Sequence, residues 1–179
     1  GGIHIADVAH YVRPDTELDK AAGRRATSIY LVDRTVPMLP EILSNDLCSL
    51  NENEDKLAFS AVFTFNRDWE IIEKWFGRTI IRSHKRFTYE EVQQILDAKQ
   101  GQYCRALHTL NQIAYRLRAE KLAAGAISFE KDEVKFVLDP NGRPRTVIRK
   151  VRTDSNLLVE DFMLLANRQV AEFVSKIVR

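Results

Sequence analysis

The strongest constraint on the fold of this 179-residue chain is a pair of strand patterns joined by a short polar turn. Residues 57–65 read as a strand, Asn66, Arg67 and Asp68 form a turn signal, and residues 69–83 continue as one or two strands. Two strands separated by so short a turn pair with each other in opposite directions. The sequence therefore predicts an antiparallel hairpin.

Helical patterns surround this hairpin. Thr16 with Asp19, and Thr88 with Glu91, have the spacing of capping boxes, so we expect helices over residues 16–32 and from residue 88 to about 101. Apolar residues recur every three or four positions in two further segments. The first, which Gly125 ends, contains Tyr103, Leu107, Leu110, Ala114 and Leu117, and the second contains Val159, Met163, Ala166, Val170 and Phe173.

Shorter strand patterns cover residues 3–12, 126–130, 134–138 and 145–151. Strands and helices do not alternate strictly, and hairpins imply antiparallel neighbours. The expected fold class is therefore α+β, with a mixed, largely antiparallel sheet packed by several helices in one domain.

Residues 37–50, PMLPEILSNDLCSL, connect a helical pattern to the hairpin. Pro37 and Pro40 forbid a continuing helix, whereas Leu39, Leu43 and Leu47 favour burial. We expect a packed connection with about one helical turn, which leads the chain from the helix bearing Tyr30 into the sheet.

The composition indicates where the protein is found more clearly than which reaction or ligand it has. The net charge is +2, too balanced to indicate a polyanionic partner by itself. No apolar run approaches the roughly 20 residues of a membrane span, and there is no signal-peptide pattern, so we expect a cytoplasmic protein without a membrane. Cys48 and Cys104 lack CxxC spacing, so neither a zinc site nor a disulfide-linked partner is expected. The oligomeric state is left open.

Candidate metal ligands are few. His4 and His10 would lie on one face of a strand and Asp7 on the other, which argues against a shared ion. The acidic residues within 51–55 and the pair Glu90 and Glu91 fit a polar turn and a helix N-terminus. Motifs of the types GxGxxG, GxxxxGK[ST], GxSxG and HExxH are absent from the sequence, which disfavours the enzyme classes they define.

Basic and aromatic residues give a modest indication of nucleic-acid binding. Five basic residues fall within ten positions, a density found in phosphate-binding strips and also on solvated surfaces: Arg143, Arg145, Arg149, Lys150 and Arg152. Tyr30 and Phe129 lie near basic residues, a combination that can stack bases, although core packing is the alternative.

Blocks of sequence in order along the chain resemble the RNB catalytic domain of the ribonuclease II and ribonuclease R family. They are HIADVAHYVRP, RRATSIYLVDRTVPMLPEILSNDLCSL, KLAFS, FTYEEVQQIL, GAISF, EVKFVLD and LVEDFMLLAN. VAHYV, SIYLVDR and VEDFMLLAN look closer to ribonuclease R of bacteria than to ribonuclease II. The resemblance covers nearly the whole chain.

The resemblance implies a processive hydrolase that shortens single-stranded RNA from its 3′ end with Mg²⁺ and releases nucleoside 5′-monophosphates. By position in SIYLVDR and GAISF, Tyr30 and Phe129 correspond to two aromatic residues that stack the last bases. Tyr89 and Glu160 correspond to residues near the terminal nucleotide, where contacts with ribose hydroxyls can favour RNA over DNA.

The resemblance also predicts that two motifs of the family, one for magnesium and one rich in arginine, are missing from these 179 residues. Family members hold magnesium with aspartates spaced DxxxxxDxDD before the GIHIADV block, and they carry an arginine motif of the type HFTSPIRRYPDL beyond the last block. Neither occurs here. We therefore expect a partial RNB domain, truncated at both ends, with no catalytic or metal-binding residue of its own and no activity alone. The alternative is a catalytically dead, RNA-binding relative.

Overall fold

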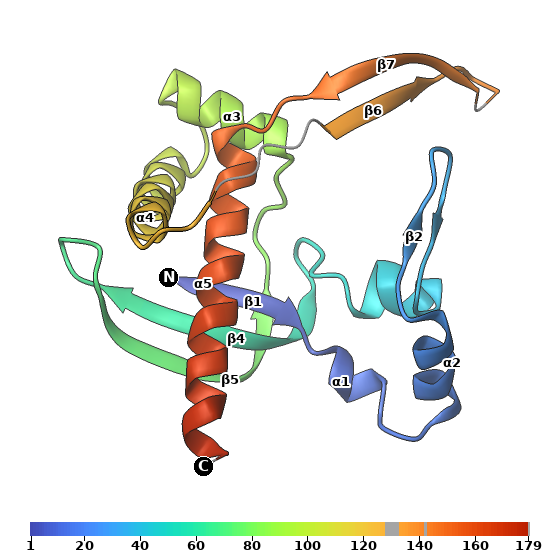
Figure 1. Ribbon diagram of the computed structural model, residues 1–179, viewed down its shortest axis with the longest axis horizontal. Helices are drawn as coiled ribbons and strands as arrows, with labels where there is room; N and C mark the ends of the chain where they lie inside the picture. The colour runs from blue at the N-terminus through green and yellow to red at the C-terminus, as the bar shows by residue number, and fades with distance from the viewer. Residues whose placement is uncertain (128–132, 142, 179) are drawn as a thin grey trace.

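The computed structural model describes residues 1–127, 133–141 and 143–178. Its architecture is α+β, as the sequence predicts, with a three-stranded sheet, two small hairpins and several helices (Figure 1). In the described residues, no helix is both long enough and apolar enough to span a bilayer.

The predicted hairpin forms the centre of the fold. β4 (Asp55–Phe65) pairs antiparallel with β5 (Ile71–Arg82), and β1 (Gly2–Ala6) pairs antiparallel with the other edge of β4. Asn66 fixes the turn, because its Oδ1 accepts hydrogen bonds from the backbone N–H groups of Asp68 and Glu70, both at 2.9 Å. β5 starts at Ile71, two residues later than expected, because Trp69 has left-handed backbone geometry (φ 62°).

α5 (Asp154–Ile177) packs across this sheet and completes the core (Figure 1). Ala61 and Phe63 of β4 meet Leu165 and Ala166 of α5. The predicted apolar stripe of α5 is only partly correct, because Val159 and Met163 are exposed. The buried face also carries polar side chains, which a count of apolar residues overlooks, and it consists of Ser155, Leu158, Asp161, Leu165, Ala166 and Gln169.

The first helices differ from the expectation. The strand predicted over residues 3–12 ends at Ala6, and α1 (Val8–Tyr11) follows Asp7. The helix predicted over residues 16–32 is α2 (Glu17–Arg25). It ends at Ala26, which has left-handed geometry (φ 63°) and whose N–H donates to the backbone oxygen of Ala22 at 2.8 Å. The chain then forms β2 (Ile29–Tyr30) and β3 (Thr35–Val36). Strand pairing overrides the helical pattern here, so Tyr30 lies on a strand and not on a helix.

The connection over residues 37–50 is packed as predicted. Leu39 and Leu43 form a buried cluster with Ala22 of α2, and Leu47 packs against it from a half-buried position. The helical part is η1 (Ile42–Leu47), a π-helix. Lys56 Nζ at the start of β4 donates hydrogen bonds of 3.0 Å to the backbone and side-chain oxygens of Asp46, which ties η1 to the sheet.

Two predicted helices are confirmed close to their expected bounds. Thr88 Oγ1 accepts from the N–H of Glu91 at 3.1 Å, and the Glu91 carboxylate accepts from the N–H of Thr88 at 2.7 Å, so the capping box of α3 (Tyr89–Ala98) is complete. α4 (Cys104–Ala123) ends just before Gly125, whose φ of +90° suits glycine.

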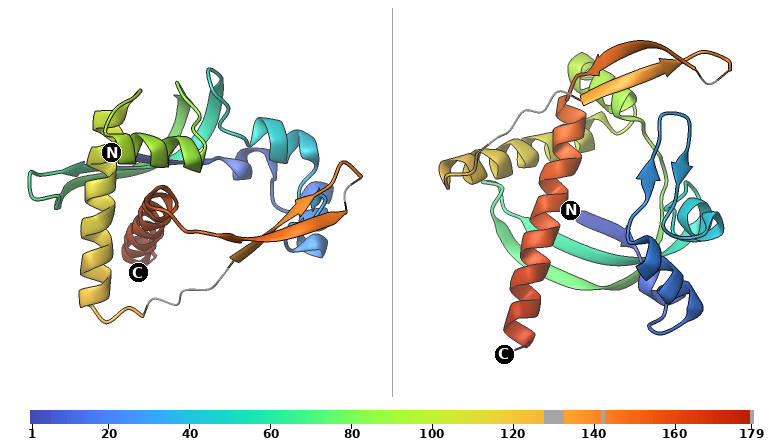
Figure 2. Two further views of the ribbon diagram at one scale, coloured as in Figure 1. Left: turned by 90° about the horizontal axis from the view of Figure 1, so that it is seen from above. Right: turned by 45° about the vertical axis from the view of Figure 1, so that its right-hand side comes forward.

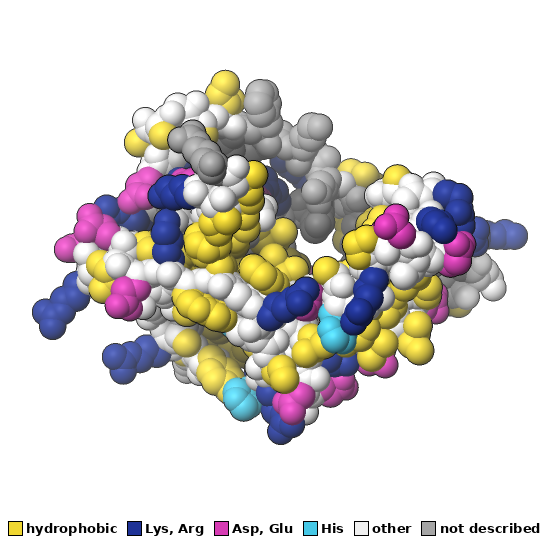
Figure 3. All heavy atoms as spheres, turned by 90° about the horizontal axis from the view of Figure 1, so that it is seen from below, with side chains coloured by type: hydrophobic (Ala, Val, Ile, Leu, Met, Phe, Trp, Pro, Cys, Tyr) yellow, Lys and Arg dark blue, Asp and Glu magenta, His cyan; other side chains and the backbone are white. Residues whose placement is uncertain are grey.

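β6 (Glu133–Leu138) and β7 (Pro144–Lys150) form a separate antiparallel hairpin. Most of the strand predicted over residues 126–130 lies outside the described residues. The β2–β3 and β6–β7 hairpins project on the same side of the molecule, with the tip of β2–β3 directed toward β6–β7 (Figures 1 and 2). Many large hydrophobic side chains remain exposed, and Figure 3 shows a face on which they mix with Lys and Arg.

Candidate functional site

Tyr30 is more exposed than the two other predicted site residues that the structure describes, Tyr89 and Glu160. It ends β2, and 80% of its surface is exposed. Its hairpin is held by backbone pairing with Thr35 and by a 2.8 Å hydrogen bond from the N–H of Leu31 to the oxygen of Arg34. The ring is therefore presented on an ordered support and is not part of the core, which removes the core-packing alternative for Tyr30.

The base of this hairpin is fastened to the connection over residues 37–50. The N–H of Met38 donates to Ser28 Oγ at 2.9 Å, and Arg25 Nη1 donates to the backbone oxygen of Pro37 at 3.0 Å. Because Leu39 and Leu43 are buried just beyond these bonds, the packed connection anchors the strand that carries Tyr30.

Tyr89 and Glu160 lie on two helices that pack together. Tyr89 is the first residue of α3 and is half-exposed, while Glu160 lies in the second turn of α5. The N–H of Ser155, at the start of α5, donates to Gln93 Oε1 of α3 at 3.2 Å and fixes the two N-terminal ends beside each other. The structure places Tyr30 on a hairpin that stands apart from both helices (Figures 1 and 2).

Glu160 lines a cavity of about 170 Å³. Three cationic side chains share this cavity with it, and they are Arg118, Lys121 and Arg152. The Glu160 carboxylate forms an ion pair with Arg152, and about half of its side chain remains exposed. Ala126 and Ile127 complete one wall, while Phe129, two residues further on, lies outside the described residues.

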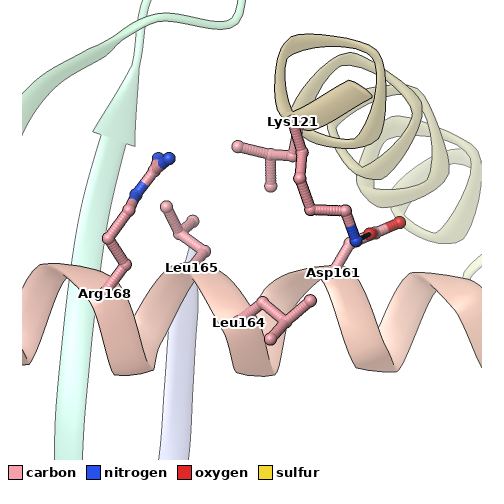
Figure 4. Close-up of a pocket in the computed structure, with 6 residues that line it drawn as sticks. Lys121, Asp161, Leu164, Leu165 and Arg168 are labelled. Atoms are coloured by element: carbon pink, nitrogen blue, oxygen red, sulfur yellow. Dashed lines mark ion pairs between the residues drawn. The ribbon is translucent and has the colours of Figure 1, made fainter. Parts of the chain in front are cut away.

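Asp161 organises the cations next to Glu160. Its side chain is 4% exposed, and its Oδ2 accepts hydrogen bonds from Nε and Nη2 of Arg118 at 3.0 and 2.7 Å. Lys121 Nζ lies 4.0 Å from the other oxygen, in a second cavity of about 240 Å³ between α4 and α5 (Figure 4). Because two charges on α4 meet one buried carboxylate, the two helices are locked in register at the site.

Tyr115 extends this arrangement along α4. The Arg118 guanidinium lies 5.2 Å from its ring centroid, and its hydroxyl donates to Asp154 at 2.7 Å. The hydrogen bond to Asp154 is the main reason that the pKa of Tyr115 is raised, so the phenol stays protonated as a donor at neutral pH.

Sequence reasoning missed Arg118, Lys121 and Asp161. Lys121 continues the three-and-four spacing of the apolar stripe on α4, and Arg118 lies one turn after Ala114 at the edge of that stripe, but their spacing carries no motif. Only the packing of α4 against α5 brings them to Glu160. Asp161 lies two residues from both Val159 and Met163, on the side of the helix opposite the predicted apolar stripe, so no local pattern identified it.

The side chains around Glu160 have chemistry that suits binding of a nucleotide. Cations beside a half-exposed carboxylate suit a phosphodiester and a ribose hydroxyl. The residues that the structure describes bring together no group of three or more His, Cys, Asp or Glu side chains that could hold a metal ion. These residues do not fit the magnesium that the sequence resemblance implies, and no catalytic step is assigned to them.

Comparison with known proteins identifies the family. The model of the RNB domain matches residues 2–177. The chain belongs to the RNB family. A DIS3-like exonuclease 2 of Schizosaccharomyces pombe is 42% identical to it over 191 aligned positions, which cover 98% of this chain and 21% of that protein. An Arabidopsis thaliana relative described as an inactive exonuclease DIS3L2 is 39% identical, over 99% of this RNB chain and 18% of its own length.

Solved structures agree with this assignment. The RNase R of Mycoplasma genitalium, in complex with ribose-methylated single-stranded RNA, matches 98% of this RNB chain and 28% of its own chain with a TM-score of 0.90 and 30% identity. The family and fold expected from the sequence are therefore confirmed. The RNB chain spans about a fifth of the length of the two curated relatives.

Proposed function

We propose that this chain is part of a processive hydrolytic exoribonuclease that degrades single-stranded RNA from its 3′ end and releases nucleoside 5′-monophosphates. The observation that carries the proposal is the likeness over almost the whole chain to an RNase R whose structure contains single-stranded RNA. The 42% identity to a DIS3-like exonuclease supports the same activity.

Tyr30 and Phe129 are the proposed walls that hold the last bases. The exposure of Tyr30, on a hairpin whose base is held by the hydrogen bond from Met38 to Ser28, supports this role. Stacking on an aromatic ring contributes about 1–3 kcal/mol per base and does not depend on base identity, which suits an enzyme that must accept every nucleotide in turn. Phe129 enters the proposal through the sequence resemblance alone.

Glu160 and Tyr89 are the proposed contacts to the terminal ribose. Glu160 lies among cations that can hold the neighbouring phosphate, and its ion pair with Arg152 orients the carboxylate. A carboxylate accepts a hydrogen bond from a 2′-hydroxyl, which DNA lacks. This pair of residues would therefore favour RNA.

The parent enzyme is proposed to use Mg²⁺ in the cytoplasm, with carboxylate ligands supplied from outside these 179 residues, which would form a partial RNB domain. Magnesium binds through a few carboxylates together with substrate phosphates. In this arrangement the chain contributes binding and orientation of the RNA tail.

A second function is supported by a specific observation. One relative with 39% identity is described as an inactive exonuclease, so an RNB domain with a similar sequence occurs in a protein without the activity. The alternative is accordingly an RNA-binding or regulatory protein that has lost catalysis.

The test uses the full-length protein that contains this domain and a 5′-labelled single-stranded RNA of about 25 nucleotides, longer than the site of one binding domain. We expect Mg²⁺-dependent loss of the RNA from its 3′ end, 5′-monophosphate products and few intermediates. Binding without shortening would favour the inactive alternative, and absence of both would contradict the proposed function. The 179-residue chain alone should show no EDTA-sensitive shortening.

A further inference from the structure

The positive charge of the chain is concentrated on the β6–β7 hairpin and the residues that follow it. Residues 133–152 contain six Lys or Arg and two Asp or Glu, while the whole chain has a net charge of +2. The remaining residues together therefore carry a net negative charge. A cationic segment on an otherwise slightly anionic chain attracts a polyanion to one place.

The hairpin presents this charge on an ordered frame. β6 and β7 pair from Glu133 with Lys150 to Leu138 with Pro144. At the tip, the Asp139 carboxylate accepts hydrogen bonds from the N–H groups of Asn141 at 2.8 Å and Arg143 at 3.0 Å. One of the two acidic residues is thus engaged by the backbone of the turn, which also fixes the start of the arginine-bearing strand.

The hairpin combines exposed arginines with an exposed aromatic ring. Phe136 pairs with Val147, and Val134 pairs with Arg149. Arg149 therefore lies on the same face as Phe136 and Val147. Arg145 lies at the register shift between the pairs Val137 with Thr146 and Leu138 with Pro144. Phe136 is 40% exposed, and Arg143 and Arg145 are exposed as well. Aromatic rings beside cations are the surface that single-stranded nucleic acids use.

The hairpin also has a suitable position. It leads through Val151 directly to Arg152, which contacts Glu160, and thus joins the proposed ribose site without a break in the chain. On the same side of the molecule, the tip of the hairpin that carries Tyr30 is directed toward β6–β7 (Figure 2).

We propose that the β6–β7 hairpin is an arm that binds the phosphates of single-stranded RNA on the 5′ side of the nucleotides held at Tyr30 and Glu160. The inference rests on the proposed function, because it assigns this surface to the same substrate. Charge complementarity selects RNA as the occupant, with Arg143 and Arg145 as phosphate ligands and Phe136 as a stacking residue.

The test measures RNA binding by the full-length protein, with EDTA present to stop hydrolysis, as a function of salt concentration. The variant is Arg143→Gln with Arg145→Gln, and the control is Arg67→Gln with Lys99→Gln, two exposed cations outside the hairpin that give the same change in charge. Losing two phosphate contacts should lower the slope of log affinity against log salt by about 1.4 for a single strand.

RNA length separates this proposal from the proposed function. The double variant should bind an RNA of about 25 nucleotides more weakly than the wild type, and it should bind one of about five nucleotides, which reaches only the terminal site, equally well. Arg143→Lys with Arg145→Lys should restore the slope. If the Gln variant keeps the slope of log affinity against log salt, or if the control loses as much slope, the hairpin does not bind the RNA phosphates as proposed. Binding of RNA by the wild type would still support the proposed function in that case. Failure of the wild type to bind RNA would overturn both.

Discussion

Arg118 donates two hydrogen bonds to a single carboxylate oxygen of Asp161, and this contact joins α4 to α5 beside the proposed ribose site. Asp161 is almost fully buried, whereas Arg118 retains 20% exposure. The two hydrogen bonds of this ion pair are well formed, and the Arg118 guanidinium keeps part of its hydration, so the free-energy cost of desolvating the cation is limited.

Asp161→Ala should lower the free energy of unfolding of this chain by about 3 kcal/mol, because it leaves the Arg118 charge without its partner between two helices. Glu120→Ala is the matched control, since it removes the half-exposed ion pair with Arg116 on α4 and should cost at most about 0.5 kcal/mol. Urea denaturation measures both values. Equal effects would show that Asp161 does not hold the helices together.

Leu43→Ala should destabilise the chain by about 2–5 kcal/mol, because Leu43 is 6% exposed within the cluster that includes Ala22 and Leu39. Its neighbour Ile42 is 66% exposed, so Ile42→Ala should change the stability by no more than about 0.5 kcal/mol. Denaturant midpoints of the two variants compare them directly. A similar small change in both would refute the role of the connection as a packed support.

His4 should make the stability depend on pH. Burial lowers the pKa of His4 below its ordinary value of 6.5, and its Nδ1 lies 2.7 Å from Ser60 Oγ. Above pH 6.5, His4 is neutral in both states and its contribution to the free energy of unfolding is complete. Below pH 6.5, the imidazole is protonated in the unfolded chain before it is protonated in the folded chain, so this contribution declines. It is lost once the pH falls below the pKa of His4 in the folded chain. His4→Asn should flatten the dependence of unfolding free energy on pH across this window. An identical slope in the variant would contradict the assignment.

Glu160→Ala should reduce discrimination between RNA and DNA ends. In the full-length protein, an RNA that ends in a 2′-deoxynucleotide should bind more weakly than an all-ribose RNA, and the variant should lose about tenfold of that difference, the value of one hydrogen bond to a charged group. Glu172→Ala on the same helix serves as the control. Binding titrations with the two RNAs give the ratio, and a ratio equal to that of the wild type would remove Glu160 from the ribose site.

Local signals along the chain predicted those parts of the fold whose partners are close in sequence. The Thr88–Glu91 capping box and the turn at Asn66 depend on neighbouring residues, and both are present. The burial of Leu39 and Leu43 was predicted from their apolar side chains, although their partner Ala22 lies in an earlier helix. The resemblance identified the family, because the quoted blocks keep their order along the chain. The roles of Tyr30, Phe129, Tyr89 and Glu160 remain predictions.

Features that depend on distant packing could not be predicted. Tyr30 belongs to a strand because residues 29–30 find a partner in residues 35–36, although the local pattern is helical. The buried face of α5 includes Asp161 and Gln169, whose burial is explained by Arg118 and by a 2.9 Å hydrogen bond from Lys74. A search for regularly spaced apolar residues does not find polar residues that are buried by distant partners. The apolar stripe predicted for α5 therefore lies on a different side of the helix from the face that is buried.

We propose that this chain binds the 3′ tail of RNA by stacking on Tyr30. The most direct measurement places 2-aminopurine among the last nucleotides of a single-stranded RNA and records its fluorescence on binding to the full-length protein in EDTA. We expect quenching by the wild type and by Tyr30→Phe, which keeps the ring, and a clear loss of quenching with Tyr30→Ala. Undiminished quenching by Tyr30→Ala at saturating protein would contradict it.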